Sequence, residues 1–167
     1  QEIFLSDDTV TANIGLRIDQ VDQQAVERAA RAAQIHDFIV DMADGYQSML
    51  GERGAAMSGG QRQRIGIARA LYHAPELLIF DEATSALDEV TQRKVLESLQ
   101  EVSRDLTVLV IAHRLEAVKT CDTICLLEKG RLVASGSFEE LLASSSQFQA
   151  FVQGAPEVNL PEAQLHG

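Results

Sequence analysis

The sequence predicts an α/β fold in which a parallel β-sheet is flanked by helices. Two observations support this class. Between residues 57 and 135, short apolar runs suited to buried strands alternate with longer stretches of helical periodicity. Two of these runs end directly at polar residues, Asp81 and His113, in the position where parallel strands present ligand-binding groups. Strand–helix–strand order requires crossover connections, which are typical of a parallel sheet.

The first helix predicted in this region covers about residues 60–72. Ile65, Ala68 and Leu71 recur at the spacing of one helix face, and Pro75 prevents the helix from continuing. An amphipathic helix is therefore expected directly before the first strand.

Two strands and an intervening helix follow. Residues 77–80 form a short apolar run, and residues 107–112 form a run rich in β-branched side chains. Between them, Val95 and Leu99 lie at helical spacing within residues 89–102. We expect a β–α–β unit with both strands in one parallel sheet.

The next stretch predicts another helix and two more strands. A helix near residues 116–120 leads to a strand over 123–127, which is expected to continue the strand–helix alternation of the parallel sheet. The pair Lys129-Gly130 then turns the chain into a strand over 131–135.

The regions on either side of residues 57–135 have different residue patterns and different predicted secondary structure. Residues 1–20 are predicted to be extended, 21–34 to be an Ala-rich helix, and 35–56 to be a small helix with a glycine-punctuated loop. Ser137 and Glu140 have the spacing of a capping box and begin a last helix.

Composition excludes several classes of protein. The 167 residues contain 14 Lys and Arg against 25 Asp and Glu, a net charge of −11, whereas a nucleic-acid binder needs a basic face. Nucleic acid is therefore not an expected partner. No apolar run approaches the roughly 18 residues of a membrane-spanning helix. The two cysteines, Cys121 and Cys125, cannot complete a four-ligand zinc site.

The first candidate site is the run Ser58-Gly59-Gly60-Gln61 at the start of the predicted helix. Ser58 and Gln61 have the spacing of a capping box, and the glycines let backbone N–H groups approach a ligand. A helix N-terminus also has positive dipole character, so the run suits a phosphate. An ordinary helix start explains the same residues, and both interpretations stay open on this motif alone.

The second candidate site is the carboxylate pair after the first strand. Asp81 could hold Mg²⁺, which prefers oxygen ligands, while Glu82 could orient or deprotonate a water molecule. An acidic turn without chemistry is an equal alternative. His113 follows the neighbouring strand in the equivalent position and could donate a hydrogen bond to a phosphoryl group, although a lone histidine is more often structural. His36 and His73 lack such a context and are expected at the surface.

Together these residues resemble the motifs of ABC ATPases, in the family's order over roughly residues 1–152. The matching segments are the signature motif at 57–71, the Walker B strand with its catalytic glutamate at 77–82, the D-loop at 85–88, the switch histidine at His113, the Q-loop glutamine at Gln1, and, at 51–54, the segment that exporter-type domains present to their membrane partner.

The resemblance implies a P-loop NTPase-like parallel sheet flanked by helices, with an incomplete core and an α-helical signature subdomain. Residues 1–74 would form the Q-loop and helical subdomain, 75–143 the C-terminal part of the RecA-like ATPase core, and 144–167 a short helix with a tail. ATP and Mg²⁺ are the implied cofactors.

The resemblance also assigns roles to individual residues. Asp81 and Gln1 would hold Mg²⁺, Glu82 would polarise the attacking water, and His113 would contact the γ-phosphate, which Gln1 would also sense. Ser58, Gly59, Gly60 and Gln61 would close over ATP bound to the opposite subunit of a head-to-tail dimer, with Asp88 at the dimer seam.

One family motif is absent from the sequence. A phosphate-binding loop requires Gly-x-x-x-x-Gly-Lys, and no Gly-Lys pair occurs. We therefore expect the chain to be the second half of the domain, from the Q-loop onward, to bind ATP weakly by itself, and to expose apolar faces of its sheet.

Three functions are compatible with the resemblance. The first is the ATPase part of an ABC exporter, located at the cytoplasmic face of a membrane through a transmembrane domain and paired with a second nucleotide-binding domain. The second is a soluble ABC ATPase of DNA repair, chromosomes or translation. The third is a catalytically dead regulatory domain. The segment at 51–54 and the acidic charge favour the first, and Glu82 and His113 match the active pattern.

Overall fold

The computed structural model describes residues 3–16, 20–51, 57–81, 89–102, 106–112 and 118–154. The chain divides into two compact units, Gln1–His113 and Arg114–Gly167. This division differs from the boundaries expected after residues 74 and 143, which stay a prediction. Within the described ranges, no helix has both the length and the apolar character needed to cross a bilayer.

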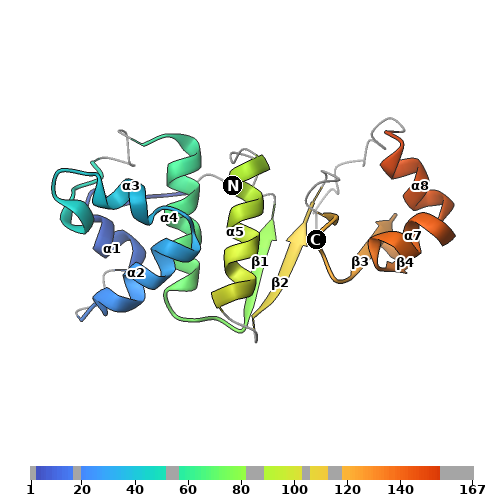
Figure 1. The fold of residues 1–167 in the computed structure, drawn as a ribbon, viewed down its shortest axis with the longest axis horizontal. Helices are drawn as coiled ribbons and strands as arrows, with labels where there is room; N and C mark the ends of the chain where they lie inside the picture. The colour runs from blue at the N-terminus through green and yellow to red at the C-terminus, as the bar shows by residue number, and fades with distance from the viewer. Residues whose placement is uncertain are drawn as a thin grey trace, which may run out of the picture. The chain divides into compact units, whose positions relative to one another are not determined.

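The first unit begins with a group of helices (Figure 1). They are α1 (Val10–Ile14), α2 (Gln23–Ala32), α3 (His36–Val40), the 3-10 helix η1 (Gly45–Gln47) and α4 (Gly59–Leu71). In this group α1 and α2 pack against α4, while α3 packs against α2 and η1 against α1. Ile65 and Ala68 of α4 are fully buried, which confirms the predicted helix face. The Ala-rich face of α2 packs against α4, and the small side chains Ala29 and Ala30 allow a close approach.

The prediction that residues 1–20 are extended is wrong for α1. Thr9 adopts an extended conformation at the N-cap, and its side chain accepts a hydrogen bond from the Ala12 N–H. Two long-range backbone hydrogen bonds then hold this region to residues 48–50, namely Val10 N–H to Ser48 O and Leu50 N–H to Asp8 O. Tertiary contacts thus stabilise a helix too short to produce a readable periodicity.

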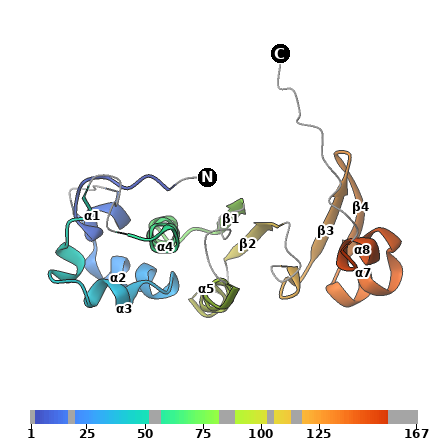
Figure 2. The same cartoon turned by 90° about the horizontal axis from the view of Figure 1, so that it is seen from above.

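The predicted β–α–β unit is confirmed. β1 (Leu77–Asp81) and β2 (Thr107–Ile111) pair in parallel, with Leu77 opposite Thr107 and Asp81 opposite Ile111. The intervening helix α5 (Glu89–Val102) lies on one face of this pair (Figure 2).

The two faces of the β1–β2 pair differ in burial. Leu78 and Phe80 are buried in the cluster that includes Val95 and Leu99 of α5. The opposite face exposes apolar side chains, each between 45% and 54% accessible: Leu77, Ile79, Leu109 and Ile111. We call these four residues the open sheet face. Its exposure agrees with the expectation from the sequence.

The described part of the second unit includes a β-hairpin, formed by β3 (Ile124–Glu128) and β4 (Arg131–Gly136), and the short helices α7 (Phe138–Ser144) and α8 (Ser146–Val152). Lys129 and Gly130 both have positive φ, as a two-residue hairpin turn requires. β3 pairs with β4 in an antiparallel ladder, and its expected continuation of the parallel sheet stays a prediction. A β-strand followed by a tight turn finds its partner locally. The helix expected near 116–120 falls largely outside the described residues.

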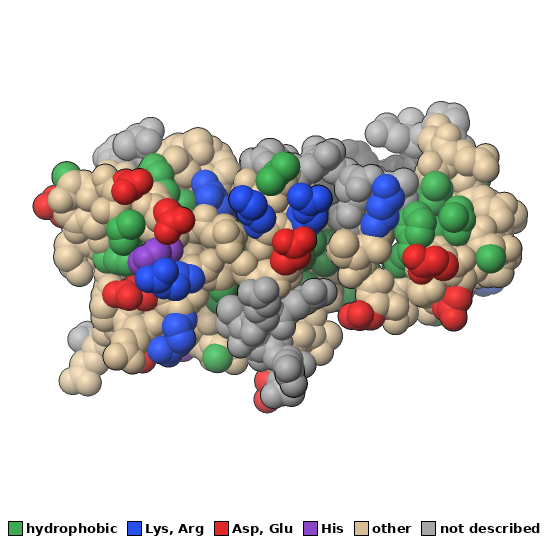
Figure 3. Space-filling model, viewed as in Figure 1, with side chains coloured by type: hydrophobic (Ala, Val, Ile, Leu, Met, Phe, Trp, Pro, Cys, Tyr) green, Lys and Arg blue, Asp and Glu red, His purple; other side chains and the backbone are tan. Residues whose placement is uncertain are grey.

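Charged side chains are distributed rather than segregated on the face drawn in Figure 3. Lys and Arg side chains lie among Asp and Glu side chains over the first unit. The net charge of −11 is therefore not gathered into a single acidic patch on this face.

Candidate functional site

The predicted phosphate site lies at an ordered, capped helix start. Ser58 Oγ accepts a hydrogen bond from the Gln61 N–H at 3.2 Å, and Gln61 Oε1 accepts one from the Ser58 N–H at 2.8 Å. This confirms the capping box at the N-terminus of α4. Ser58 and Gly59 are exposed, whereas Gly60 and Gln61 are half-buried. The arrangement presents the first turn of a 13-residue helix to solvent, where its dipole favours an anion.

The predicted magnesium ligand Asp81 is the last residue of β1. It is exposed and pairs in register with Ile111, near the end of β2. The burial of β1 alternates, so Asp81 follows Leu77 and Ile79 on the exposed side of the strand. One exposed carboxylate at the end of a strand is a suitable donor for Mg²⁺, which usually takes one or two carboxylates and completes its shell with water and phosphate oxygens.

The structure brings only some of the predicted residues together. Ser58, Gly59, Gly60 and Gln61 form one group, and within the described ranges no hydrogen bond or ion pair joins Asp81 to it. No cluster of three or more His, Cys, Asp or Glu side chains suited to a metal occurs among the residues searched. The remaining predicted residues lie outside the described ranges: Gln1, Glu82, Asp88 and His113.

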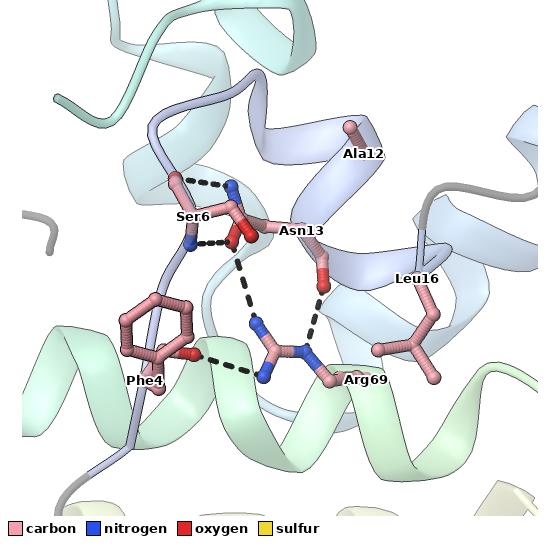
Figure 4. A pocket seen from close by; sticks show the side chains of 6 residues that line it. All are labelled: Phe4, Ser6, Ala12, Asn13, Leu16 and Arg69. Atoms are coloured by element: carbon pink, nitrogen blue, oxygen red, sulfur yellow. Dashed lines mark hydrogen bonds between the residues drawn. The ribbon is translucent and has the colours of Figure 1, made fainter. Parts of the chain in front are cut away.

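A polar cluster that the sequence did not predict lies on α4, beside an open pocket of about 170 Å³ (Figure 4). The Arg69 guanidinium donates hydrogen bonds to Asn13 O at 2.8 Å, to Phe4 O at 3.0 Å and to Asn13 Oδ1 at 3.3 Å. Partial burial lowers the pKa of Arg69 from its ordinary value, but a guanidinium keeps its charge. Phe4 and Leu16 at the pocket rim are 67% and 53% exposed.

Asn13 holds this cluster from the other side. It is only 2% exposed, and its amide nitrogen donates to the backbone oxygens of Ser6, Asp8 and Thr9. Its Oδ1 accepts from the Ser6 N–H at 2.9 Å. One sequence signal could have revealed this cluster: Asn13 lies between the apolar residues Val10 and Ile14. An asparagine in a buried segment needs hydrogen-bond partners.

A second polar residue of α4 is buried, and one of its side-chain atoms makes no hydrogen bond. Gln63 is 7% exposed, and its Oε1 has no hydrogen-bond partner. A buried acceptor in this state raises the free energy of the folded chain, since water would have satisfied it in the unfolded chain.

Comparison with known proteins gives a consistent family. A family model described as ABC transporter matches residues 1–85. The ATP-dependent lipid A-core flippase of Saccharophagus degradans is 44% identical over 148 residues, which cover 89% of this chain and 25% of the flippase. The leukotoxin translocation ATP-binding protein LktB of Mannheimia haemolytica is 43% identical over 152 residues, or 91% of this chain and 22% of that protein.

A solved structure described as a bacterial Atm1-family ABC exporter with ATP bound is also similar. It has a TM-score of 0.83 and 39% sequence identity, covering 94% of this chain and 28% of the exporter chain. The chain thus spans about a quarter of the length of the curated relatives that it matches. The motif order, the capped helix at Ser58 and these matches together show that the chain belongs to the ABC transporter family.

Proposed function

We propose that this chain forms the second half of the ATP-binding domain of an ABC exporter, in which ATP hydrolysis powers transport. The observation that supports this most is the similarity, over 94% of the chain, to an exporter structure described as having ATP bound. The capped start of α4 and the strand ending at Asp81 supply the two kinds of group that such a domain needs, an anion-binding helix end and a metal-binding carboxylate.

At the helix end, Ser58, Gly59, Gly60 and Gln61 would contact ATP held by a second ATP-binding domain, arranged head to tail. The exposure of Ser58 and Gly59 supports this, because a partner can reach them without rearrangement of α4. The capping box uses the N–H of Gln61, while Gly59 and Gly60 supply first-turn N–H groups to which the helix itself offers no acceptor. Asp88 would lie at the seam between the two domains.

At the strand end, Asp81 and Gln1 would hold Mg²⁺, which would neutralise charge on the phosphates. Glu82 would polarise the attacking water, and His113 would contact the γ-phosphate, which Gln1 would also sense. The parallel register supports this grouping, because it sets the end of β1 beside the end of β2, at which the sequence continues to Glu82 and His113 respectively.

The expected partners are a second ATP-binding domain and the transmembrane domains of the exporter, with this chain at the cytoplasmic face of the membrane. The names of the relatives above give two different cargoes, lipid A-core and leukotoxin, at nearly equal identity to this chain, 44% and 43%. We infer that cargo is selected by parts of the transporter outside this chain.

The test uses the full-length transporter that contains this chain. Glu82→Gln should abolish ATP hydrolysis while leaving ATP binding largely intact, because the amide cannot polarise water as a carboxylate does. Glu97→Gln, an exposed residue of α5, is the matched control and should hydrolyse ATP normally. Near-normal hydrolysis in the Glu82→Gln transporter would remove Glu82 from this role, and a wild-type transporter without ATP hydrolysis would contradict the function.

A further inference from the structure

The segment that follows residue 2 contacts one side of the signature helix α4 at two successive points. At the first point, Arg69 donates a hydrogen bond to the Phe4 carbonyl oxygen at 3.0 Å. At the second, the backbone of Gly66 approaches Ile3 so closely that an added Cβ would lie 2.8 Å from Ile3 Cδ1. The segment is therefore held against α4 by a hydrogen bond and by direct packing.

These two contacts define a direction. From Phe4 to Ile3, the contact on α4 moves from Arg69 back to Gly66, toward the N-terminal end of the helix. That end bears Ser58 and Gln61 in the capping box. The segment thus runs parallel to α4, and a displacement of either along the helix axis acts on the other.

Arg69 also holds the far end of the same segment. Its Nε and one terminal nitrogen donate to the backbone oxygen and side-chain Oδ1 of Asn13, and Asn13 in turn binds the backbone of Ser6, Asp8 and Thr9 (Figure 4). One guanidinium therefore connects both ends of a loop whose interior is fixed by a buried amide. Such a loop moves as one piece with the helix that bears Arg69.

We propose that Arg69 is a positioning residue that couples the segment after Gln1 to the signature helix, so that both move together when nucleotide binds. This inference rests on the proposed function, because it takes Gln1 and the Ser58 end of α4 as nucleotide-facing groups. Arg69 donates its hydrogen bonds to protein oxygens and acts only through the groups that it holds.

The functional test is Arg69→Lys in the full-length transporter. Lysine keeps the charge, but its single ammonium group cannot reach acceptors at both ends of the loop. We expect the KM for ATP to stay within about twofold and kcat to fall by about ten- to a hundredfold, since misplacement of positioned groups affects the reacting state most. Arg93→Lys, an exposed residue of α5, is the control and should leave both constants unchanged.

A double variant tests whether Arg69 and Asn13 act as one unit. Asn13→Ala should lower kcat in the same way, and Arg69→Lys/Asn13→Ala should be no slower than the slower single variant, because both substitutions break one connection. Losses in kcat that multiply would show that the two residues act separately and would contradict the coupling.

Hydrogen exchange on the transporter supplies a readout of motion. Arg69→Lys should speed amide exchange in residues 4–16 while exchange in α4 stays slow. Arg64→Lys is the control on the same helix, because Arg64 donates to Gln34 O at 2.6 Å and should loosen the end of α2 instead.

The outcomes separate this inference from the proposed function. Normal kcat in Arg69→Lys overturns the coupling while ATP hydrolysis by the wild type upholds the function. The coupling is also overturned if amide exchange speeds up equally in residues 4–16 and in α4, and if kcat falls only in proportion to the amount of folded protein. That result would mean that Arg69 contributes to stability alone. If Arg69→Lys does not fold, Asn13→Ala keeps Arg69 but removes one of its acceptors and the amide that fixes the loop, and an unchanged kcat in that variant would overturn the coupling.

Discussion

The hydroxyl of Tyr46 lies 2.8 Å from Nδ1 of His36 and joins η1 to α3 by a hydrogen bond. The sequence predicted His36 at the surface, but the structure finds it half-buried beneath this contact. Burial, assisted by the nearby Glu27 carboxylate and opposed by Arg31, raises the pKa of Tyr46 to about 12. The folded chain therefore disfavours the tyrosinate.

This shift predicts a loss of stability at alkaline pH. Below the unfolded pKa of 10.0, Tyr46 is protonated in both states and its contribution is fully present. Between about 10 and 12 the unfolded chain releases this proton while the folded chain retains it, so the free energy of unfolding falls. Urea unfolding at pH 9, 10 and 11 measures this fall. The free energy of unfolding should fall less steeply with pH in Tyr46→Phe than in the wild-type chain. Identical slopes in both proteins would contradict the assignment.

The capping box of α4 predicts a combined effect on stability and on nucleotide binding. Ser58→Ala should lower the free energy of unfolding by about 1 kcal/mol, since the Gln61 N–H loses its acceptor, and should weaken ATP binding by the transporter. Ser137→Ala is the matched control, because Ser137 and Glu140 form the same box at the start of α7. It should cost similar stability without affecting nucleotide. Equal weakening of ATP binding by both would disprove a special role for Ser58.

The unsatisfied oxygen of Gln63 predicts a stabilising substitution. Gln63→Met keeps the side-chain length and removes a buried acceptor without a partner, so the free energy of unfolding should rise by about 1 kcal/mol. Thermal unfolding measures this directly. A lower melting temperature would indicate that the amide makes a contact that the static structure does not contain.

The open sheet face predicts self-association of the 167-residue chain. Ile79→Thr with Leu109→Thr should reduce light scattering and the binding of an apolar dye, because both side chains are about half exposed on this face. Val90→Thr is the control. Val90 is 54% exposed on α5 and belongs to a different surface. Unchanged scattering in the double variant would exclude the open sheet face as the associating surface.

The missing phosphate-loop motif predicts weak nucleotide binding by this chain alone. No Gly-Lys pair is present to cradle the phosphates, and the start of α4 would act on a nucleotide held by a partner. Calorimetric titration of the 167-residue chain with ATP and Mg²⁺ should give no measurable heat at micromolar concentrations. A micromolar dissociation constant would contradict this.

Local signals in the sequence predicted much of the fold and part of the site. α4, β1, α5 and β2 were predicted to within about a residue because a capping box, Pro75 and β-branched runs act over short distances. The antiparallel pairing of β3 with β4 was not predicted, because a strand pattern by itself does not determine which strand it pairs with. Likewise, Ser58 and Gln61 are neighbours in the chain, whereas Arg69 and Asn13 meet only through folding.

The close approach of Gly66 to Ile3 has a consequence for how this sequence can vary. A methyl group at position 66 fits only when the side chain at position 3 shrinks or withdraws, so the two positions are not independent under selection. Among homologous chains we expect larger residues at 66 to occur with smaller ones at 3. Gly66→Ala paired with Ile3→Val should accordingly be tolerated better than Gly66→Ala alone.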